Sequence, residues 1–175
     1  MINGIVAVDL NWGIGKINKE TGGGQLLFDI PADMKHFVDL TRNNIVVMGY
    51  STYMSLPKRP LKNRTNIVLW DKASSLNCLD GALTFNNFEQ LLHGVQLLAE
   101  RYEVFICGGA SVYKLFLPYY DRVYLTRVNA VDEEATAFFP DLDKYEFLEC
   151  TEGLMPIEDN GYQIQFLTYT RKPVD

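Results

Sequence analysis

The sequence has little cysteine and little histidine. Its three cysteines, Cys78, Cys107 and Cys150, are odd in number and far apart, which is a poor framework for disulfides and fits a reducing compartment. With only two histidines beside them, His36 and His93, no spacing typical of metal ligands appears. We therefore expect neither a disulfide nor a bound metal.

Long apolar runs and an excess of positive charge are also missing. No apolar run in the 175 residues approaches the roughly 18 to 20 residues that span a bilayer, and residues 1–4 lack the basic region of a secretory signal. The formal net charge of −6 offers no basic surface for a nucleic acid or an anionic lipid. We expect a cytoplasmic monomer that binds neither nucleic acid nor membrane.

Strand and helix patterns alternate along most of the chain. No repeat or linker divides it, so we expect a single domain over residues 1–175. Helical patterns cover residues 31–41, 87–100 and 110–117. Apolar runs typical of strands buried on both faces lie at 5–8, 45–48, 67–70, 104–107 and 123–126. This alternation predicts an α/β fold with a mainly parallel central sheet and helices on both faces.

The C-terminal part has a different pattern. Residues 162–166 alternate apolar and polar side chains, as a half-solvated antiparallel strand does. We expect this strand to pair with the segment 145–149. The predicted architecture is therefore a mixed sheet, parallel in the middle with an antiparallel C-terminal edge.

Two of the predicted strands end in glycine and lead at once into a helix. Gly49 follows the strand at 45–48, and Gly108 and Gly109 follow the strand at 104–107. A helix N-terminus presents unpaired N–H groups to anions, and ligands of open α/β sheets bind outside the carboxyl ends of the strands. The two turns together suggest a pyrophosphate site. Either glycine turn alone is equally well explained as a tight turn, since neither is a Walker or GxGxxG motif.

Three further features admit two interpretations each. Asp33, in the first turn of the helix at 31–41, either complements the helix dipole or stands above a pocket with Phe37 as proton donor or substrate anchor. Arg64, in a loop, is either solvated or binds a substrate carboxylate. The glycine run 22–24 is either an idle surface loop or a mobile lid.

Taken together and in order, these segments resemble the dihydrofolate reductase family over nearly the whole chain. Each motif is weak alone, but together and in this order they are highly specific. The resemblance implies hydride transfer from C4 of a reduced nicotinamide, NADPH, to C6 of 7,8-dihydrofolate, giving tetrahydrofolate. The segments that carry it are 5–15, 26–34, 47–53, 60–64, 107–113, 122–126 and 139–140.

Asp33 is the catalytic acid that the resemblance implies. In the family this buried carboxylate binds the 2-amino and N3 side of the pterin and promotes protonation of N5, because burial disfavours its charged form. Thr126 would hydrogen-bond the carboxylate. Phe28 stands where the family usually has a tryptophan whose N–H holds a water, and phenylalanine lacks that donor. The catalytic positions implied are thus Asp33, Thr126 and Phe28.

Apolar side chains and one arginine make up the substrate site that the resemblance implies. Phe37, Leu56 and Leu61 would flank the pterin and aminobenzoyl rings, and Arg64 would bind the α-carboxylate of the glutamate tail. The full set of substrate-binding residues implied is Ile5, Val6, Ala7, Asp33, Met34, Phe37, Leu56, Leu61, Arg64, Cys107, Tyr113 and Thr126.

The coenzyme site implied by the resemblance includes both glycine turns. The peptide between Gly108 and Gly109 is expected to be cis, as in the family. The coenzyme-binding residues implied are Ala7, Ile14, Gly15, Leu26, Gly49, Tyr50, Ser51, Thr52, Leu69, Trp70, Asp71, Cys107, Gly108, Gly109, Ala110, Ser111, Val112 and Tyr113.

The chain departs from the family where the 2′-phosphate of NADPH binds. Tyr50 stands in place of the usual arginine after Gly49, and Asp71 follows Trp70 where serine or arginine is common. An aspartate there repels a phosphate and accepts from a free ribose hydroxyl, unless Lys72 compensates. We expect a weakened preference for NADPH, with NADH as a second coenzyme.

The loop that covers the active site in the family also differs. The segment 15–28 is several residues longer here and contains the triple glycine, with Leu27 in place of the usual proline. Thr136 and Ala137 stand where many bacterial members have an aspartate that latches this loop. The loop dynamics of the family are therefore not expected to carry over.

Two other interpretations remain beside dihydrofolate reductase. The reductase of riboflavin biosynthesis shares the fold and the nicotinamide turns but reduces a ribosylaminopyrimidine phosphate. An inactive nucleotide-binding module would explain the changes at Phe28, Tyr50 and Asp71. The presence of Asp33 and Arg64 together with both glycine turns favours dihydrofolate reductase over both.

Overall fold

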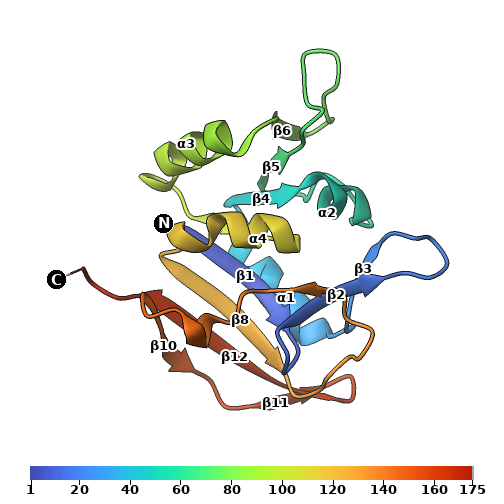
Figure 1. Ribbon diagram of the computed structural model, residues 1–175, viewed down its shortest axis with the longest axis vertical. Coiled ribbons are helices and arrows are strands. Elements are labelled where there is room, and N and C mark those ends of the chain that lie inside the picture. Colours follow the sequence, from blue (N-terminus) through green and yellow to red (C-terminus); the bar gives the residue numbers. More distant parts are fainter. Residues whose placement is uncertain (175) are drawn as a thin grey trace.

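The computed structural model describes residues 1–174, and its centre is a nine-stranded mixed sheet (Figure 1). The strands of this sheet are β1 (Ile2–Val8), β4 (Ile45–Gly49), β5 (Thr65–Leu69), β6 (Ala82–Phe85), β7 (Val104–Ile106), β8 (Arg122–Val128), β10 (Leu148–Gly153), β11 (Ile157–Asp159) and β12 (Tyr162–Arg171). Their order is β10-β12-β8-β1-β7-β4-β5-β6, with β11 paired to β12.

The middle of this sheet is parallel and one edge is antiparallel. Strands β8, β1, β7, β4, β5 and β6 pair in parallel, and β12 runs antiparallel to β8 and β10. Parallel strands covered on both faces are apolar throughout, which is why β4 reads as a continuous apolar run. The predicted mixed α/β sheet is confirmed.

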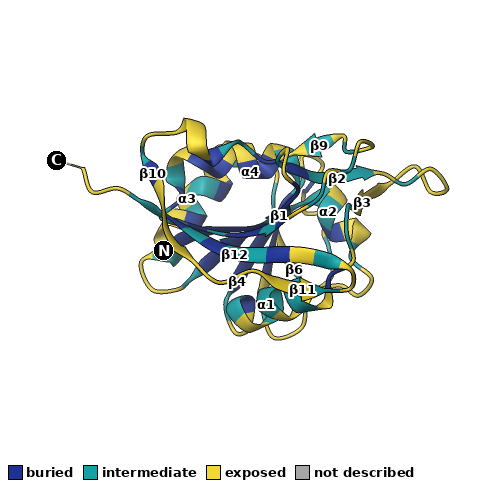
Figure 2. Cartoon of the chain, turned by 90° about the horizontal axis from the view of Figure 1, so that it is seen from below, coloured by how far each residue is buried: buried dark blue, intermediate teal, exposed yellow. Residues whose placement is uncertain are grey.

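Helices cover both faces of the sheet. They are α1 (Pro31–Thr41), α2 (Tyr50–Ser55), α3 (Phe88–Ala99) and α4 (Ala110–Phe116), with short 3-10 turns η1 (Leu117–Tyr119) and η2 (Leu142–Lys144). In Figure 2, α3 and α4 lie on one side of the sheet and α1 lies on the other. Alternate side chains of β4 point to opposite faces of the sheet. Val47 packs with residues of α3 and α4 on one face. Val46 and Met48 pack on the other face, in the cluster that Phe37 of α1 contacts.

The helix bounds follow from local sequence signals. Pro31 occupies the first turn of α1, where its fixed backbone angle suits the helix and its missing N–H costs nothing. The side chain of Asn87 caps α3 by accepting from the Gln90 amide at 2.9 Å. All three predicted helices are present, with ends that agree to within about a residue.

The predicted pairing of the C-terminal strand is right in its partner but wrong in its register, because β12 runs antiparallel to β10, which begins at Leu148, yet residues 162–166 do not face the segment 145–149. The start of β12 pairs with β11 and β8, through Ile157 opposite Ile164, whereas β10 pairs with the later part of β12, through Leu148 opposite Arg171. The reason is a tight turn at Asn160 and Gly161, whose positive φ values of 48° and 83° suit a two-residue hairpin. An alternating pattern identifies a strand but does not select its neighbour.

The glycine-rich segment after β1 forms a hairpin. It consists of β2 (Gly13–Ile17) and β3 (Gly24–Leu26), and with β9 (Ala137–Phe138) it makes a second, three-stranded sheet. Lys16 pairs with Asp132 at 2.7 Å, and the Thr136 amide donates to the Gly15 carbonyl at 2.9 Å. The hairpin, which projects from the body of the molecule in Figure 1, is thus held at its base by the segment 132–138.

Within residues 1–174, no group of three histidine, cysteine, aspartate or glutamate side chains is placed to hold a metal ion. In the same range no helix is long and apolar enough to cross a membrane. All three cysteines are free.

Candidate active site

The two predicted glycine turns touch each other. The Gly49 amide donates to the Gly108 carbonyl at 2.9 Å, which joins the carboxyl ends of the neighbouring strands β4 and β7. A side chain would crowd this edge, because a Cβ on Gly49 would lie 3.1 Å from Val112 Cγ2 and one on Gly109 would lie 3.3 Å from Thr52 Oγ1. No side chain of the described residues caps the start of α2 or of α4. The turns therefore form one edge lined by backbone amides, and the expected cis peptide between Gly108 and Gly109 is confirmed.

Asp33 and Thr126 lie together, as the resemblance implies. The Thr126 hydroxyl, buried on β8, donates to Asp33 Oδ1 at 2.7 Å. Burial raises the pKa of Asp33, while the Thr126 hydrogen bond and the neighbouring His36 lower it to a smaller extent. Burial in turn lowers the pKa of His36. The result is a carboxyl group whose neutral form persists to higher pH than that of an ordinary aspartate.

The position of Asp33 depends on a hairpin more than a hundred residues away. The start of α1 has no cap from its own preceding residue, Ile30. Instead, Asp159 Oδ2 accepts from the Ala32 amide at 2.6 Å, and Asn160 Nδ2 donates to the Asp29 carbonyl at 2.7 Å. These positioning residues, Asp159 and Asn160, were not predicted from the sequence. The dipeptide Asn160-Gly161 marks a turn, but no signal in the sequence shows which helix that turn caps.

An apolar cluster gathers predicted site residues from distant segments of the chain. Its buried members come from β1, α2 and the central strands: Ile5, Val46, Met48, Tyr53, Val68 and Phe105. The predicted residues that pack on them, all partly buried, are Phe37, Tyr50, Leu56, Leu61, Trp70 and Cys107. The structure therefore brings the predicted ring-contacting side chains, Phe37, Leu56 and Leu61, into one cluster.

Arg64 lies at the edge of this cluster. Its Nε donates to Thr41 Oγ1 at 3.1 Å, its Nη1 donates to the Lys62 carbonyl at 2.9 Å, and its guanidinium carbon lies 5.8 Å from the centre of the Phe37 ring. Its Nη2 is buried without a hydrogen-bond partner among residues 1–174. A buried, unpartnered guanidinium nitrogen is costly unless a ligand completes it. Thr41, which was not among the predicted site residues, fixes the guanidinium.

Two other ionisable side chains of the site stay protonated. The Tyr113 hydroxyl donates to the Ile5 carbonyl at 2.7 Å, and burial raises its pKa well above the ordinary value. Burial also raises the pKa of the Cys107 thiol to about 12, and its sulfur donates to the Phe105 carbonyl. The interpretation of Cys107 as a small buried side chain without reactivity is favoured.

Some predicted residues lie outside this arrangement. Phe28 packs against Tyr162, with 4.9 Å between ring centres, in a separate cluster that contains Ile30. Leu26 on β3 is 69% exposed and Met34 on α1 is 53% exposed. The remaining predicted positions are Val6 and Ala7 on β1, Ile14 and Gly15 on β2, Ser51 and Thr52 on α2, Leu69 at the end of β5, Asp71 in the next turn, and Ala110, Ser111 and Val112 on α4.

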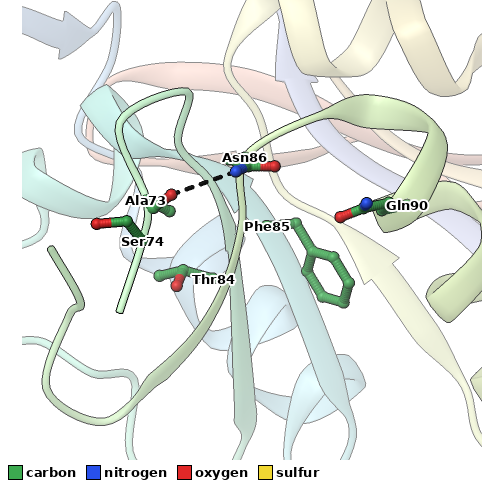
Figure 3. A pocket seen from close by; sticks show the side chains of 6 residues that line it. All are labelled: Ala73, Ser74, Thr84, Phe85, Asn86 and Gln90. Atoms are coloured by element: carbon green, nitrogen blue, oxygen red, sulfur yellow. Dashed lines mark hydrogen bonds between the residues drawn. The ribbon is translucent and has the colours of Figure 1, made fainter. Parts of the chain in front are cut away.

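A separate hollow of about 370 Å³ lies where β6 leads into α3 (Figure 3). No charged side chain lines it; the lining residues are Ala73, Ser74, Thr84, Phe85, Asn86 and Gln90. Asn86 donates to the Ala73 carbonyl at 3.4 Å across it. The hollow adjoins the turn that carries Trp70 and Asp71, since the Ala73 amide donates to the Trp70 carbonyl.

A mainly parallel sheet with two joined glycine turns at its strand ends is typical of a dinucleotide-binding fold, and the largely buried carboxyl of Asp33 suits proton transfer. The family model for dihydrofolate reductase matches residues 1–171. The chain therefore belongs to the dihydrofolate reductase family, and the resemblance found in the sequence is confirmed.

Individual relatives match along their whole length. The dihydrofolate reductase of Haemophilus influenzae is 35% identical over 169 residues, covering 96% of this chain and 97% of the relative. That of Bacillus subtilis is 32% identical over 173 residues, covering 98% and 95%. A solved structure of dihydrofolate reductase from Enterococcus faecalis, complexed with NADP(H) and the compound RAB-propyl, matches with a TM-score of 0.81 at 29% identity, covering 99% of this chain and 97% of that one.

Proposed function

We propose that this protein reduces 7,8-dihydrofolate to 5,6,7,8-tetrahydrofolate with NADPH as the hydride donor. The observation that carries the proposal is the hydrogen bond between Thr126 and the largely buried carboxyl of Asp33, with Arg64 beside the apolar cluster that contains Phe37. Family membership supports the same reaction, and the relatives bear its name. Neither the pyrimidine reductase nor the inactive module is favoured.

The substrate site has one acidic and one basic group, with apolar side chains beside them. Asp33 faces the 2-amino and N3 side of the pterin, where its ionised form accepts from both N–H groups. Phe37 and Leu61, which pack in the same cluster, flank the rings. Arg64 uses its unpartnered Nη2 for the α-carboxylate of the glutamate tail, in a charge-assisted hydrogen bond.

The residues present fit a dinucleotide coenzyme. The edge formed by Gly49 and Gly108 leaves backbone amides free of side chains, and neither helix start is capped by a described side chain. Residues 50–52 and 110–112 would hold the diphosphate through their amides. NADPH, when bound there, supplies the hydride.

Asp33 promotes protonation at N5 of the substrate. Burial raises its pKa, so the neutral carboxyl is available at a pH where an exposed aspartate is ionised. Thr126 fixes the orientation of the carboxyl by donating to one of its oxygens. Because Tyr113 and Cys107 keep their protons, they do not compete for this role.

A comparison of substrates tests the proposed function. Loss of reduced-nicotinamide absorbance is followed after addition of either dihydrofolate or a ribosylaminopyrimidine phosphate to the purified protein with NADPH. We expect turnover with dihydrofolate alone. Turnover with the pyrimidine, or with neither compound, would contradict the proposal.

We further propose that the protein acts as a monomer in the cytoplasm and binds no nucleic acid. The net charge of −6 and the free cysteines support this. Light scattering at the concentration of the activity assay should give the mass of one 20.0 kDa chain. A mass of two chains would contradict the proposed monomer.

A further inference from the structure

Asp71 lies at the same sheet edge as the first glycine turn. Strands β4 and β5 are parallel neighbours, with Gly49 opposite Leu69, and Asp71 follows Leu69 by two residues. The turn that carries it is fixed at both ends, because the Trp70 amide donates to the Phe85 carbonyl at 2.8 Å and the Ala73 amide donates to the Trp70 carbonyl at 2.9 Å. The exposed residue Asp71 therefore follows β5 at the sheet edge that carries the proposed coenzyme site.

Such an acid has a known chemical consequence in dinucleotide sites. An aspartate about 20 residues beyond the glycine turn, after the neighbouring strand, accepts from the ribose 2′-hydroxyl, whereas an arginine nearby accommodates a 2′-phosphate. Asp71 comes 22 residues after Gly49 and follows the end of the neighbouring strand β5. Its position in the chain therefore matches that of the ribose-binding aspartate. A carboxylate within a few ångströms of a dianionic phosphate repels it.

Flat aromatic side chains occupy the position beside Asp71. The rings of Tyr50 and Trp70 are stacked, with centres 4.6 Å apart and planes inclined by 8°. Both are partly buried on the apolar cluster described above. Tyr50 directly follows Gly49, so an uncharged phenol takes the position nearest to the turn.

Cations are scarce around this edge. Residues 49–52 and 108–113 contain no lysine or arginine, and none of the side chains that line the hollow of Figure 3 is charged. Lys72 is the single cation in the turn 70–73, and the negative charge of the adjacent Asp71 balances its positive charge. A 2′-phosphate would find no arginine partner in these segments, while ribose hydroxyls would find a carboxylate.

We propose that Asp71, with the Tyr50–Trp70 pair, adapts the coenzyme site to a free ribose diol, so that NADH serves as hydride donor with a kcat/KM within about tenfold of that of NADPH. This inference rests on the proposed function, because it concerns the coenzyme of the same reaction. It names Asp71 as the residue that determines coenzyme specificity.

Equilibrium binding tests the inference without turnover. The dissociation constants of NAD⁺ and NADP⁺ are measured by calorimetry for the wild type, for Asp71→Asn and for Glu149→Gln. Glu149 is a matched control, since it is an exposed carboxylate on β10 at the far edge of the sheet. We expect wild-type constants within about tenfold of each other, and about fivefold tighter NADP⁺ binding with weaker NAD⁺ binding in Asp71→Asn. Glu149→Gln should change neither constant.

Either of two results would overturn the inference. One is wild-type binding of NADP⁺ more than about tenfold tighter than that of NAD⁺, and the other is an unchanged ratio of the two constants in Asp71→Asn. Kinetics separate this failure from failure of the proposed function. Fast turnover with NADPH and a kcat/KM for NADH more than about tenfold lower overturns only the inference. Absence of dihydrofolate turnover with either coenzyme overturns the function, while the binding ratio still tests Asp71.

Discussion

The hydroxyl of Thr126 on β8 donates to a carboxyl oxygen of Asp33 on α1 at 2.7 Å, across 93 residues of sequence. The two elements lie in different layers, a central strand and a helix on one face of the sheet. Burial raises the pKa of Asp33 and the hydrogen bond lowers it, so this contact sets how much of the carboxyl is protonated at a given pH.

Thr126→Val should shift the pH dependence of the reaction. Loss of the hydroxyl removes a hydrogen bond to the charged form, so the pKa of Asp33 rises further. If the neutral carboxyl promotes N5 protonation, the fall in hydride-transfer rate with rising pH moves to higher pH. Stopped-flow rates across a pH series measure the midpoint. Thr126→Ser, which keeps the hydroxyl, should leave the midpoint unchanged, and an unshifted midpoint in the valine variant would count against the assigned role.

Arg64→Gln should weaken substrate binding and leave the chemistry largely intact. A charge-assisted hydrogen bond to a carboxylate is worth about 1.5–3 kcal/mol, so KM for dihydrofolate should rise by about 10- to 150-fold. A dihydropterin without the glutamate tail should show no such change. Arg42→Gln, at the exposed C-cap of α1, is the matched control. An equal effect on both substrates would place Arg64 outside the carboxylate site.

Asp159→Ala should loosen the start of α1. The side chain accepts from the Ala32 amide and is the cap that this helix otherwise lacks, so its loss should lower the free energy of unfolding by about 1 kcal/mol. Because Asp33 follows in the same turn, kcat should fall as well. Denaturant unfolding and steady-state kinetics check both, with the neighbouring exposed Glu158→Ala as control. Unchanged stability and kcat would show that the hairpin does not position Asp33.

Asp33→Asn should stabilise the protein increasingly as pH rises. The folded pKa lies above the ordinary 3.8, so the contribution of the neutral carboxyl to stability is complete below that value and is lost as pH rises through the folded pKa. Asparagine stays neutral throughout. The difference in unfolding free energy should therefore grow in the variant's favour, by about 1.4 kcal/mol per unit by which the pKa is raised. A difference that is constant with pH would mean that the pKa of Asp33 is not raised by folding.

Local signals made much of the fold predictable. Pro31 and the apolar spacing after it give the bounds of α1, and the continuous apolar run of β4 marks a strand covered on both faces. The antiparallel character of β12 and its pairing with the segment that begins β10 were also evident, but the register was not. An alternating pattern is satisfied by any neighbour of the right length, and the Asn160-Gly161 turn selects β11.

The candidate site was less predictable because its contacts join distant segments. The hydrogen bond from Gly49 to Gly108 depends on the adjacency of β4 and β7, which no local pattern specifies. The support that Thr41 gives to Arg64 spans 23 residues, and a threonine at the end of a helix carries no distinctive signal. Resemblance to a family supplied the candidate residues, and the fold supplied their geometry.

The most direct test compares the rate of hydride transfer in the wild type and in Asp33→Asn from acidic to alkaline pH. Dihydrofolate is mixed with protein and NADPH, and the loss of reduced-nicotinamide absorbance is followed. Asp39→Asn, an exposed carboxylate on the same helix, serves as the control. We predict rapid wild-type turnover that falls as pH rises through the raised pKa of Asp33, and a loss of about 10²-fold or more in Asp33→Asn near neutral pH. Full turnover of Asp33→Asn at neutral pH would contradict the account.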